Sequence, residues 1–307
     1  MSGTDFSLCS NPPSSQTEVC ATLMPGPAPI IIQPWNRNSQ VKKMSAANHS
    51  SPFYVTLKRA LALRRTCLED ICQTDDQVAR RVLHDYGAMF VGAEAVLSPP
   101  LCVFSSEEQV SRFQKAAGRA AATIGDAVIE LQPAAMAALL KARAAALAAG
   151  LDITPRDGAE AARRSYADTV RLWNSRFLPA LAHWANTERL SQPQAERLRG
   201  LPVKEQVPEV LELEKEGIFF SKDLSKSVLY SIAAPGTSQH IAMLAFDANE
   251  FSDPRVRELL AHQGWFQTVL SDLPHFTFLG LAEGALPGRG LRRVEVDGQT
   301  FWIPDVA

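Results

Sequence analysis

Three residues in the second half of the chain have the types and neighbours that metal chemistry needs. His240 ends the segment Pro-Gly-Thr-Ser-Gln-His, Asp247 follows seven positions later, and His275 ends the segment Asp-Leu-Pro-His. Two imidazoles and one carboxylate are the ligands with which a catalytic zinc ion keeps a fourth position open for water. The sequence therefore predicts a site for one Zn²⁺ per chain on His240, Asp247 and His275.

The same residues also allow ordinary structural roles. A histidine after a glycine-rich turn is often a hydrogen-bonded loop residue, and Asp247 can cap the turn before Pro254. The other histidines lack comparable neighbours, and we expect them to be structural or exposed: His49, His84, His183 and His262.

The elements that would carry the three ligands are strands. The apolar run 241–246 has the length of a strand, which places His240 at its entrance and Asp247 at its far end. His275 follows a proline and opens a second strand. Ligands on adjacent strands of one sheet can converge on one ion.

Helical periodicity dominates the first half of the chain and strand patterns the second. Helices are predicted over 53–92, from 105–106 onward, over 133–150, 159–187, 206–216 and 254–262. Strands are predicted over 128–131, 218–220, 266–270 and 276–279, with a hairpin around Asp297-Gly298. The predicted fold class is α+β, with a helical N-terminal part packed on a small, mainly antiparallel sheet that carries the metal site.

Composition excludes several kinds of partner. The net charge is -2 and no long Lys/Arg run occurs, so nucleic acid is not an expected partner. No apolar stretch reaches the roughly 18 residues of a transmembrane helix. Residues 1–30 lack the basic start and apolar core of an export signal.

The five cysteines leave the compartment open. They form no Cys-x-x-Cys pair, so a zinc knuckle is not expected. Cys67 and Cys72 can lie on adjacent turns of a helix or form a disulfide, and an odd total leaves at least one thiol free or intermolecular. The other cysteines are Cys9, Cys20 and Cys102.

Three segments together resemble the D-alanyl-D-alanine carboxypeptidase family of zinc peptidases. Residues 235–247 are similar to its signature, Ser-x-His, six residues, then Asp. Residues 264–266 and 274–280 resemble the segment that supplies the third ligand, and 164–168, with Leu172-Trp173 behind them, resemble its Tyr-Arg-Ser-Tyr segment. The resemblance covers roughly residues 125–285 and implies the family's fold, in which His240, Asp247 and His275 bind zinc.

The resemblance also implies an activity and roles for further residues. It implies hydrolysis of an amide bond in D-Ala-containing peptidoglycan peptides, with Asp272 as the general base and catalytic residue. Arg164 is then a catalytic and substrate-binding residue that pairs with the substrate carboxylate or the developing oxyanion, and Ser238 binds substrate or orients its neighbours. Cell-wall peptides imply an extracytoplasmic location, periplasmic or secreted.

The chain departs from the family pattern at two positions and in one length. Asp272 stands where the family usually has Glu, and its carboxylate is shorter by one C–C bond, about 1.5 Å. Met243 stands where the family commonly has Gly. Residues 188–234 form a long insertion between Arg164 and His240.

Two other interpretations follow from these departures. The chain can be a catalytically weak, zinc-bearing module that binds cell-wall peptides or a protein partner, or a domain without metal. Four parts are expected: a disordered leader over 1–50 (or a mis-assigned start before Met44), a helical cap or extension over 51–120, a zinc peptidase-like domain over 121–285 and a C-terminal β-hairpin over 286–307.

Overall fold

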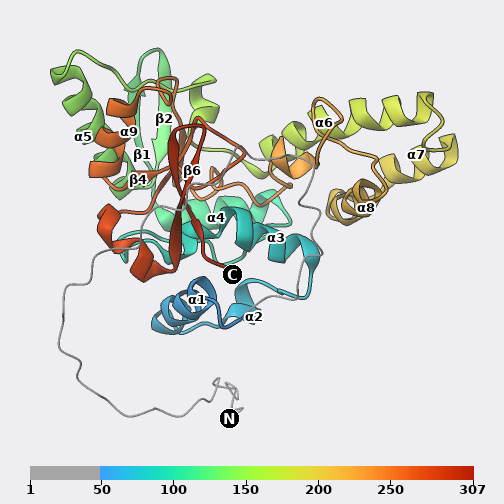
Figure 1. Ribbon diagram of the computed structural model, residues 1–307, viewed down its shortest axis with the longest axis horizontal. Coiled ribbons are helices and arrows are strands. Elements are labelled where there is room, and N and C mark those ends of the chain that lie inside the picture. The colour runs from blue at the N-terminus through green and yellow to red at the C-terminus, as the bar shows by residue number, and fades with distance from the viewer. Residues whose placement is uncertain (1–48) are drawn as a thin grey trace, which may run out of the picture.

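The computed structural model describes residues 49–307 (Figure 1). The leader predicted over 1–50 lies outside the described residues except for its last two positions, and so do Cys9, Cys20 and Met44. Helices and small antiparallel sheets alternate along the described chain, which confirms the α+β class. None of the described helices has the length and apolar character needed to cross a membrane.

The α-helices and strands fall in the following ranges. The helices are α1 Pro52–Leu63, α2 Leu68–Ile71, α3 Gln77–Tyr86, α4 Glu107–Ala117, α5 Pro133–Ala148, α6 Tyr166–Asn186, α7 Gln192–Gly200, α8 Val203–Lys215 and α9 Pro254–His262. The strands are β1 Ala120–Ile124, β2 Ala127–Leu131, β3 Ala245–Asp247, β4 Trp265–Phe266, β5 His275–Phe278, β6 Leu291–Val296 and β7 Gln299–Pro304. Short 3₁₀ turns are η1 Gly87–Val91, η2 Gly158–Ala161, η3 Val228–Tyr230, η4 Glu283–Ala285 and η5 Pro287–Arg289.

The strands of the described residues pair in three antiparallel sheets. The central sheet has the order β3-β5-β4, and its strands are buried throughout. β1 pairs with β2, and β6 pairs with β7. The predicted hairpin is confirmed: Asp297 and Gly298 both have positive φ, as a type I′ turn requires.

Local signals explain where several helices begin. The Ser106 side chain accepts a hydrogen bond from Gln109 N at the start of α4, and Pro254 occupies the first turn of α9, both as predicted. Ser165 and Asp168 form a capping box at the start of α6. Arg164 directly precedes this capped start.

Several element predictions were wrong. The helix predicted over 53–92 is divided into α1, α2, α3 and η1. No strand forms at 218–220, and the strand predicted over 266–270 begins at Trp265 and ends at Phe266. β1 was not predicted, because three of its five residues are alanines, which have little strand propensity, and pairing with β2 decides their conformation.

α5 packs through Met136 and Leu139 together with small residues. Ala135, Ala142 and Ala146 are buried, whereas Leu140 and Leu147 are exposed to 40% and 52%. The small side chains allow the close approach of α9. Arg143 forms a half-buried ion pair with Asp152 at 2.7 Å.

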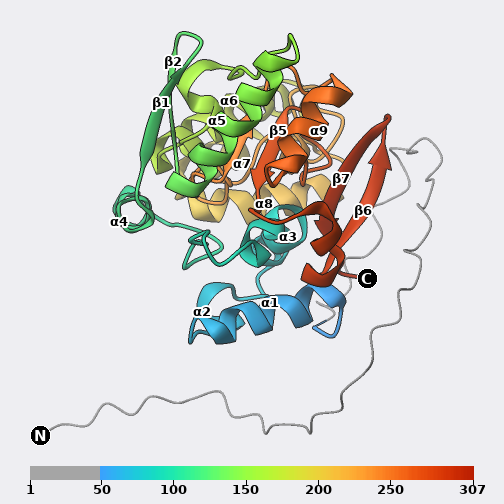
Figure 2. The ribbon, with the colours of Figure 1, turned by 90° about the vertical axis from the view of Figure 1, so that its left-hand side faces the viewer.

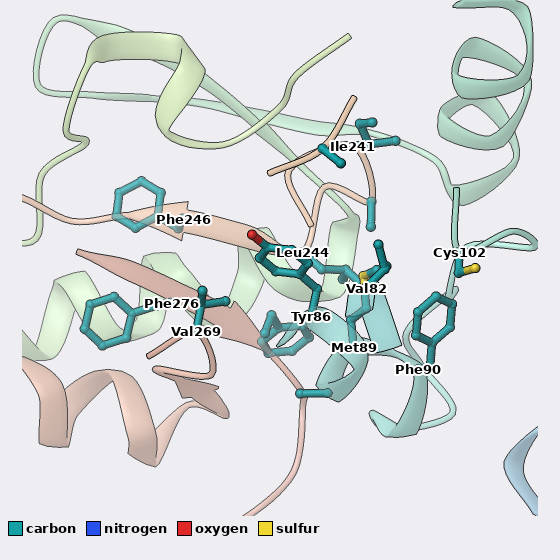
Figure 3. Close-up of a cluster of buried hydrophobic side chains, with 14 of the residues drawn as sticks. Val82, Tyr86, Met89, Phe90, Cys102, Ile241, Leu244, Phe246, Val269 and Phe276 are labelled. Carbon is teal, nitrogen blue, oxygen red and sulfur yellow. The ribbon is translucent and has the colours of Figure 1, made fainter. Parts of the chain in front are cut away.

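The N-terminal helices share a hydrophobic core with the central sheet. Tyr86 on α3 and Met89 on η1 pack in one cluster with Leu244 and with Phe276 on β5 (Figure 3). α1 and α2 lie beyond α3 at one end of the molecule (Figure 2). The cap predicted over 51–120 thus reaches the strand that carries His275.

A disulfide ties α2 to the segment before α4. It joins Cys72 to Cys102, with Cα atoms 5.4 Å apart, so the Cys67–Cys72 disulfide considered above does not form. Cys67 instead contacts Asp70 within the α2 capping box.

The insertion predicted over 188–234 contains two α-helices. Its helices α7 and α8 follow the end of α6, and the three extend together to one side of the rest of the molecule (Figure 1). After α8 the chain returns through residues 218–234 to the segment that carries His240.

Candidate metal centre

Asp247 and His275 are direct cross-strand partners. Asp247 ends β3, His275 begins β5, and the antiparallel register pairs the two residues. Side chains of directly opposed residues lie on the same face of a sheet, which brings Asp247 Oδ1 to 3.0 Å from His275 Nδ1. The prediction that these two ligands lie on adjacent strands is therefore confirmed in its geometry.

His240 lies in a chain of turns and not at a strand entrance. Successive backbone hydrogen bonds join Ile241 to Ser238, Ala242 to Gln239 and Met243 to His240. The strand predicted from residue 241 begins only at Ala245, because these turns use the backbone groups that a strand would pair.

Met243 ends these turns in a left-handed conformation, with φ +55°. This is the backbone region that glycine enters without steric cost and that other residues rarely adopt. The Met243 side chain is completely buried, so its packing offsets the backbone strain.

Gly236 fixes the approach of the chain to His240. Its φ is +77°, and a Cβ atom at this position would lie 1.9 Å from the carbonyl oxygen of Phe104. Phe104 N donates to Gly236 O at 2.9 Å, and Gly236 N donates to Thr169 Oγ1 at 3.1 Å. The segment that leads to His240 is therefore held between the chain after the disulfide and α6.

Three ligand atoms converge in a buried triangle. His240 Nε2 lies 3.2 Å from His275 Nδ1 and 3.3 Å from Asp247 Oδ1, and the third side is 3.0 Å. Four ligands at about 2.0–2.1 Å around zinc form a tetrahedron whose edges are roughly 3.3 Å. His240, Asp247 and His275 are 1%, 7% and 4% exposed, and the group can hold one metal ion.

The outer nitrogen of each histidine faces an oxygen that can only accept. His240 Nδ1 lies 2.8 Å from the carbonyl oxygen of Ala162, and His275 Nε2 lies 2.7 Å from Gln239 Oε1. Both outer nitrogens must carry protons. In the neutral imidazoles the inner nitrogens then present lone pairs to each other and to the Asp247 carboxylate, an arrangement that a cation stabilises.

A proton on His240 does not take the place of that cation at neutral pH. Burial and the positive charge of Arg164 lower the pKa of His240 to about 4. Burial alone would raise the pKa of the Asp247 carboxyl, but the two histidines outweigh burial and hold that pKa well below 3.8. At neutral pH the site therefore presents a neutral His240 and a carboxylate.

Arg164 fixes the carboxylate of Asp247. Its Nη2 donates to Asp247 Oδ2 at 3.0 Å, while its Nε donates to the carbonyl oxygen of Glu160 at 3.1 Å. Arg164 Nη1 has no hydrogen-bond partner among residues 49–307, and Arg164 lines the cavity beside the site. The residue predicted to bind substrate thus also orients a ligand.

A cavity of about 120 Å³ opens onto the metal centre. It is lined by the predicted residues Arg164, Ser238, Asp272, His240 and His275, whereas Asp247 lies behind them. Ser238 Oγ accepts a hydrogen bond from His240 N at 3.3 Å, which supports the turn.

Asp272 is open to solvent at the cavity, and it shares a short turn with His275, whose N donates to Asp272 O. Partial desolvation on the side that faces the protein, together with the negative charge of Asp247, raises the pKa of Asp272. The structure therefore brings all the predicted site residues into one region.

Sequence reasoning missed the residues that support the ligands. Gln239 precedes His240 directly, and its position in the motif is the one signal that points to it. Tyr86 and residues 229–233 also line the cavity, but they come from distant parts of the chain and no pattern marks them.

Comparisons of the chain with protein-family models, curated proteins and solved structures give no match. The class that fold and geometry define is an α+β protein with a buried His-Asp-His group able to hold one metal ion.

Proposed function

We propose that the protein is a zinc-dependent peptidase of the D,D-carboxypeptidase type, which hydrolyses an amide bond in D-Ala-containing peptidoglycan peptides. The observation that carries the proposal is the triangle of His240 Nε2, His275 Nδ1 and Asp247 Oδ1, with its tautomers set by outer hydrogen bonds. An arginine and a carboxylate beside that triangle supply the other groups that amide hydrolysis needs.

Zinc is the proposed metal because of the donor set. Two imidazole nitrogens and one carboxylate suit zinc, whereas calcium and magnesium prefer oxygen ligands. Three protein ligands would leave a zinc ion one position free for water, as in catalytic zinc sites. The metal, when bound, supplies an acidified water and polarises the scissile carbonyl.

Asp272 is the proposed proton carrier. It reaches the cavity, and its raised pKa suits a group that first accepts a proton and then passes it to the leaving amine. Arg164 Nη1 is directed to the substrate carboxylate or to the oxyanion, and Ser238 borders the substrate at the same cavity.

An extracytoplasmic location is part of the proposal. Cell-wall peptides lie outside the cytoplasm, and disulfides such as Cys72–Cys102 persist in oxidising compartments.

A second function, a zinc-bearing module that binds cell-wall peptides without efficient hydrolysis, is favoured by one observation. Asp272 carries a side chain one carbon shorter than the Glu that the resemblance implies. A carboxylate outside hydrogen-bond reach of the reacting proton cannot act as the base.

Metal content tests the proposal. Purified wild-type protein supplied with zinc is expected to hold about one ion per chain, and a His240→Ala, His275→Ala double variant little. A His183→Ala, His262→Ala variant, which removes two exposed histidines outside the site, is the matched control and should keep its zinc. Negligible zinc in the wild type would overturn the proposal, and bound zinc leads to an assay for D-Ala release from a D-Ala-D-Ala peptide.

A further inference from the structure

The cavity at the metal centre has two walls of different origin. One wall comes from the segments that carry the ligands, with Ser238, Gln239, Val269 and Asp272. The other is made by residues 229–233, which belong to the return of the insertion after α8. The insertion thus contributes directly to the space in front of the metal.

Contacts from three helices hold this second wall in place. On α3, Tyr86 Oη donates to the carbonyl oxygen of Leu229 at 3.5 Å. From α6, Arg176 Nε donates to Ser231 Oγ at 2.9 Å, and from α8, Glu214 accepts from Val228 N at 2.6 Å. These contacts make the segment a fixed surface rather than a loosely placed loop.

Tyr230 contacts Arg81 on α3. The guanidinium of Arg81 lies 5.1 Å from the centre of the Tyr230 ring, a cation–π distance. Arg81 is in turn paired with Asp85 on the same helix. Tyr230 and the half-buried Ile232 both line the cavity.

The space between the two walls is small. It measures about 120 Å³, whereas sites for drug-sized ligands occupy about 300–1,000 Å³. Arg164 lines this cavity, and its Nη1, which has no hydrogen-bond partner among residues 49–307, is a donor that suits a carboxylate. An occupant of these dimensions is the end of a peptide with a small last residue, and not the middle of a chain.

We infer that residues 229–233 form a specificity wall, in which Tyr230 and Ile232 limit the last residue of the substrate to a small side chain. The inference rests on the proposed function, since it names the part of the substrate that this cavity receives. Shortening either side chain should open the cavity to larger terminal residues, because one added or missing methylene in an apolar pocket changes binding by about tenfold or more.

Binding of two stable analogues tests the wall. The probes are phosphinate dipeptide analogues, which resist hydrolysis, ending in either alanine or phenylalanine. Calorimetry on the zinc-supplied protein would compare wild type with Tyr230→Ala and, separately, Ile232→Ala. Leu178→Ala, on α6 and 40% exposed, is the control that removes apolar volume away from the cavity.

The expected result is a wild-type preference for the alanine analogue of about tenfold or more. This preference should shrink to about threefold or less in at least one wall variant and persist in Leu178→Ala. Equal binding of both analogues by the wild type, no binding of either, or an unchanged preference in both wall variants would overturn the inference. Zinc measured in the same samples separates the two failures: a wild type without zinc refutes the proposed function, whereas a zinc-loaded wild type without preference refutes only the wall.

Discussion

Gln239 directly precedes His240 in the chain, yet its side chain is hydrogen-bonded to His275. Gln239 Oε1 accepts from His275 Nε2 at 2.7 Å, and its amide nitrogen donates to the carbonyl oxygen of Tyr86 at 2.9 Å. The second contact fixes which end of the amide faces His275. A single residue thereby links the N-terminal helices, the His240 turn and the strand of His275.

Replacing Gln239 with Leu should weaken zinc binding. The change removes the acceptor that keeps the proton of His275 on Nε2, and loss of such a partner typically lowers metal affinity by about 10–100-fold. Competition titration with a chromogenic chelator measures the affinity.

Gln206→Leu is the control for that substitution. Gln206 is also buried, and it bonds to Trp173 Nε1 and to Leu201 O at a distance from the cavity. Its loss should reduce stability and leave zinc affinity unchanged. Equal zinc affinity in wild type and Gln239→Leu would mean that β5 alone orients His275.

Arg164→Lys and Arg163→Lys form a matched pair of adjacent substitutions. Lys lacks the planar fork with which Arg164 bonds to Asp247 and to Glu160 O together. Loss of a charge-assisted hydrogen bond costs about 1.5–3 kcal/mol, so zinc affinity and hydrolysis should each fall about tenfold or more. Arg163 bonds to Gln114 and Glu130 instead, and its substitution should leave both quantities close to wild type. Similar effects of the two changes would contradict a specific role for Arg164.

Substitutions of Asp272 distinguish the proposed peptidase from the alternative binding module. If it is the proton carrier, Asp272→Asn should lower the rate of D-Ala release by about 10²–10⁴-fold while zinc stays bound. Asp272→Glu restores the longer side chain and should raise the rate. Ser271→Ala, the neighbouring group at the cavity, should change it little.

Two outcomes of that series would count against hydrolysis through Asp272. Full activity in Asp272→Asn would show that another group carries the proton. The binding module would be favoured if the wild type and Asp272→Glu, both loaded with zinc, bind a D-Ala-D-Ala peptide without cleaving it.

The residues of the candidate metal centre were predictable because their types are distinctive within short segments of the sequence. His240 with Asp247, and Asp272 with His275, lie in short segments whose residue types are unusual together. Their convergence depends on the register that pairs Asp247 with His275, and the predicted succession of strands was sufficient to anticipate it. The position of His240 in a turn could not be predicted from the sequence, because an apolar run has the same pattern in a buried turn and in a strand.

The residues that support the candidate metal centre could not be predicted, and the reason is different. Ala162 O, Tyr86 and residues 229–233 reach the site through tertiary packing, and their contacts involve backbone atoms that any residue possesses. α5 shows the same limit: Ala135, Ala142 and Ala146 are buried while two of its leucines are exposed, because the approach of α9 decides which face is covered.

The Cys72–Cys102 disulfide should contribute measurably to stability. It closes a loop with a sequence separation of 30, for which chain-entropy arguments give about 3–4 kcal/mol. A Cys72→Ser, Cys102→Ser double variant should lose free energy of unfolding on this scale in urea titrations. Cys67→Ser, outside the disulfide, is the control and should stay near wild type. A double variant as stable as the control would show that the N-terminal core holds the segment without the cross-link.

Titration of the buried Glu214 should lower the free energy of unfolding as pH rises. Burial raises the pKa of Glu214 above its ordinary value of 4.5, although hydrogen bonds from Ser227, Val228 and Phe220 oppose the shift. The folded state therefore binds a proton that the unfolded chain releases at lower pH. The resulting stability is fully present below pH 4.5 and is lost as pH rises from there through the folded-state pKa.

Glu214→Gln removes this titration, so the fall in the free energy of unfolding above pH 4.5 should be smaller than in the wild type. Urea titrations over a series of pH values measure the difference. Glu209→Gln, on the same helix, is the control: the hydrogen bond from Arg197 lowers the pKa of Glu209, which gives the opposite sign, and exposure keeps the effect small. Parallel pH profiles for wild type and Glu214→Gln would show that Glu214 is ionised at no cost in the folded protein.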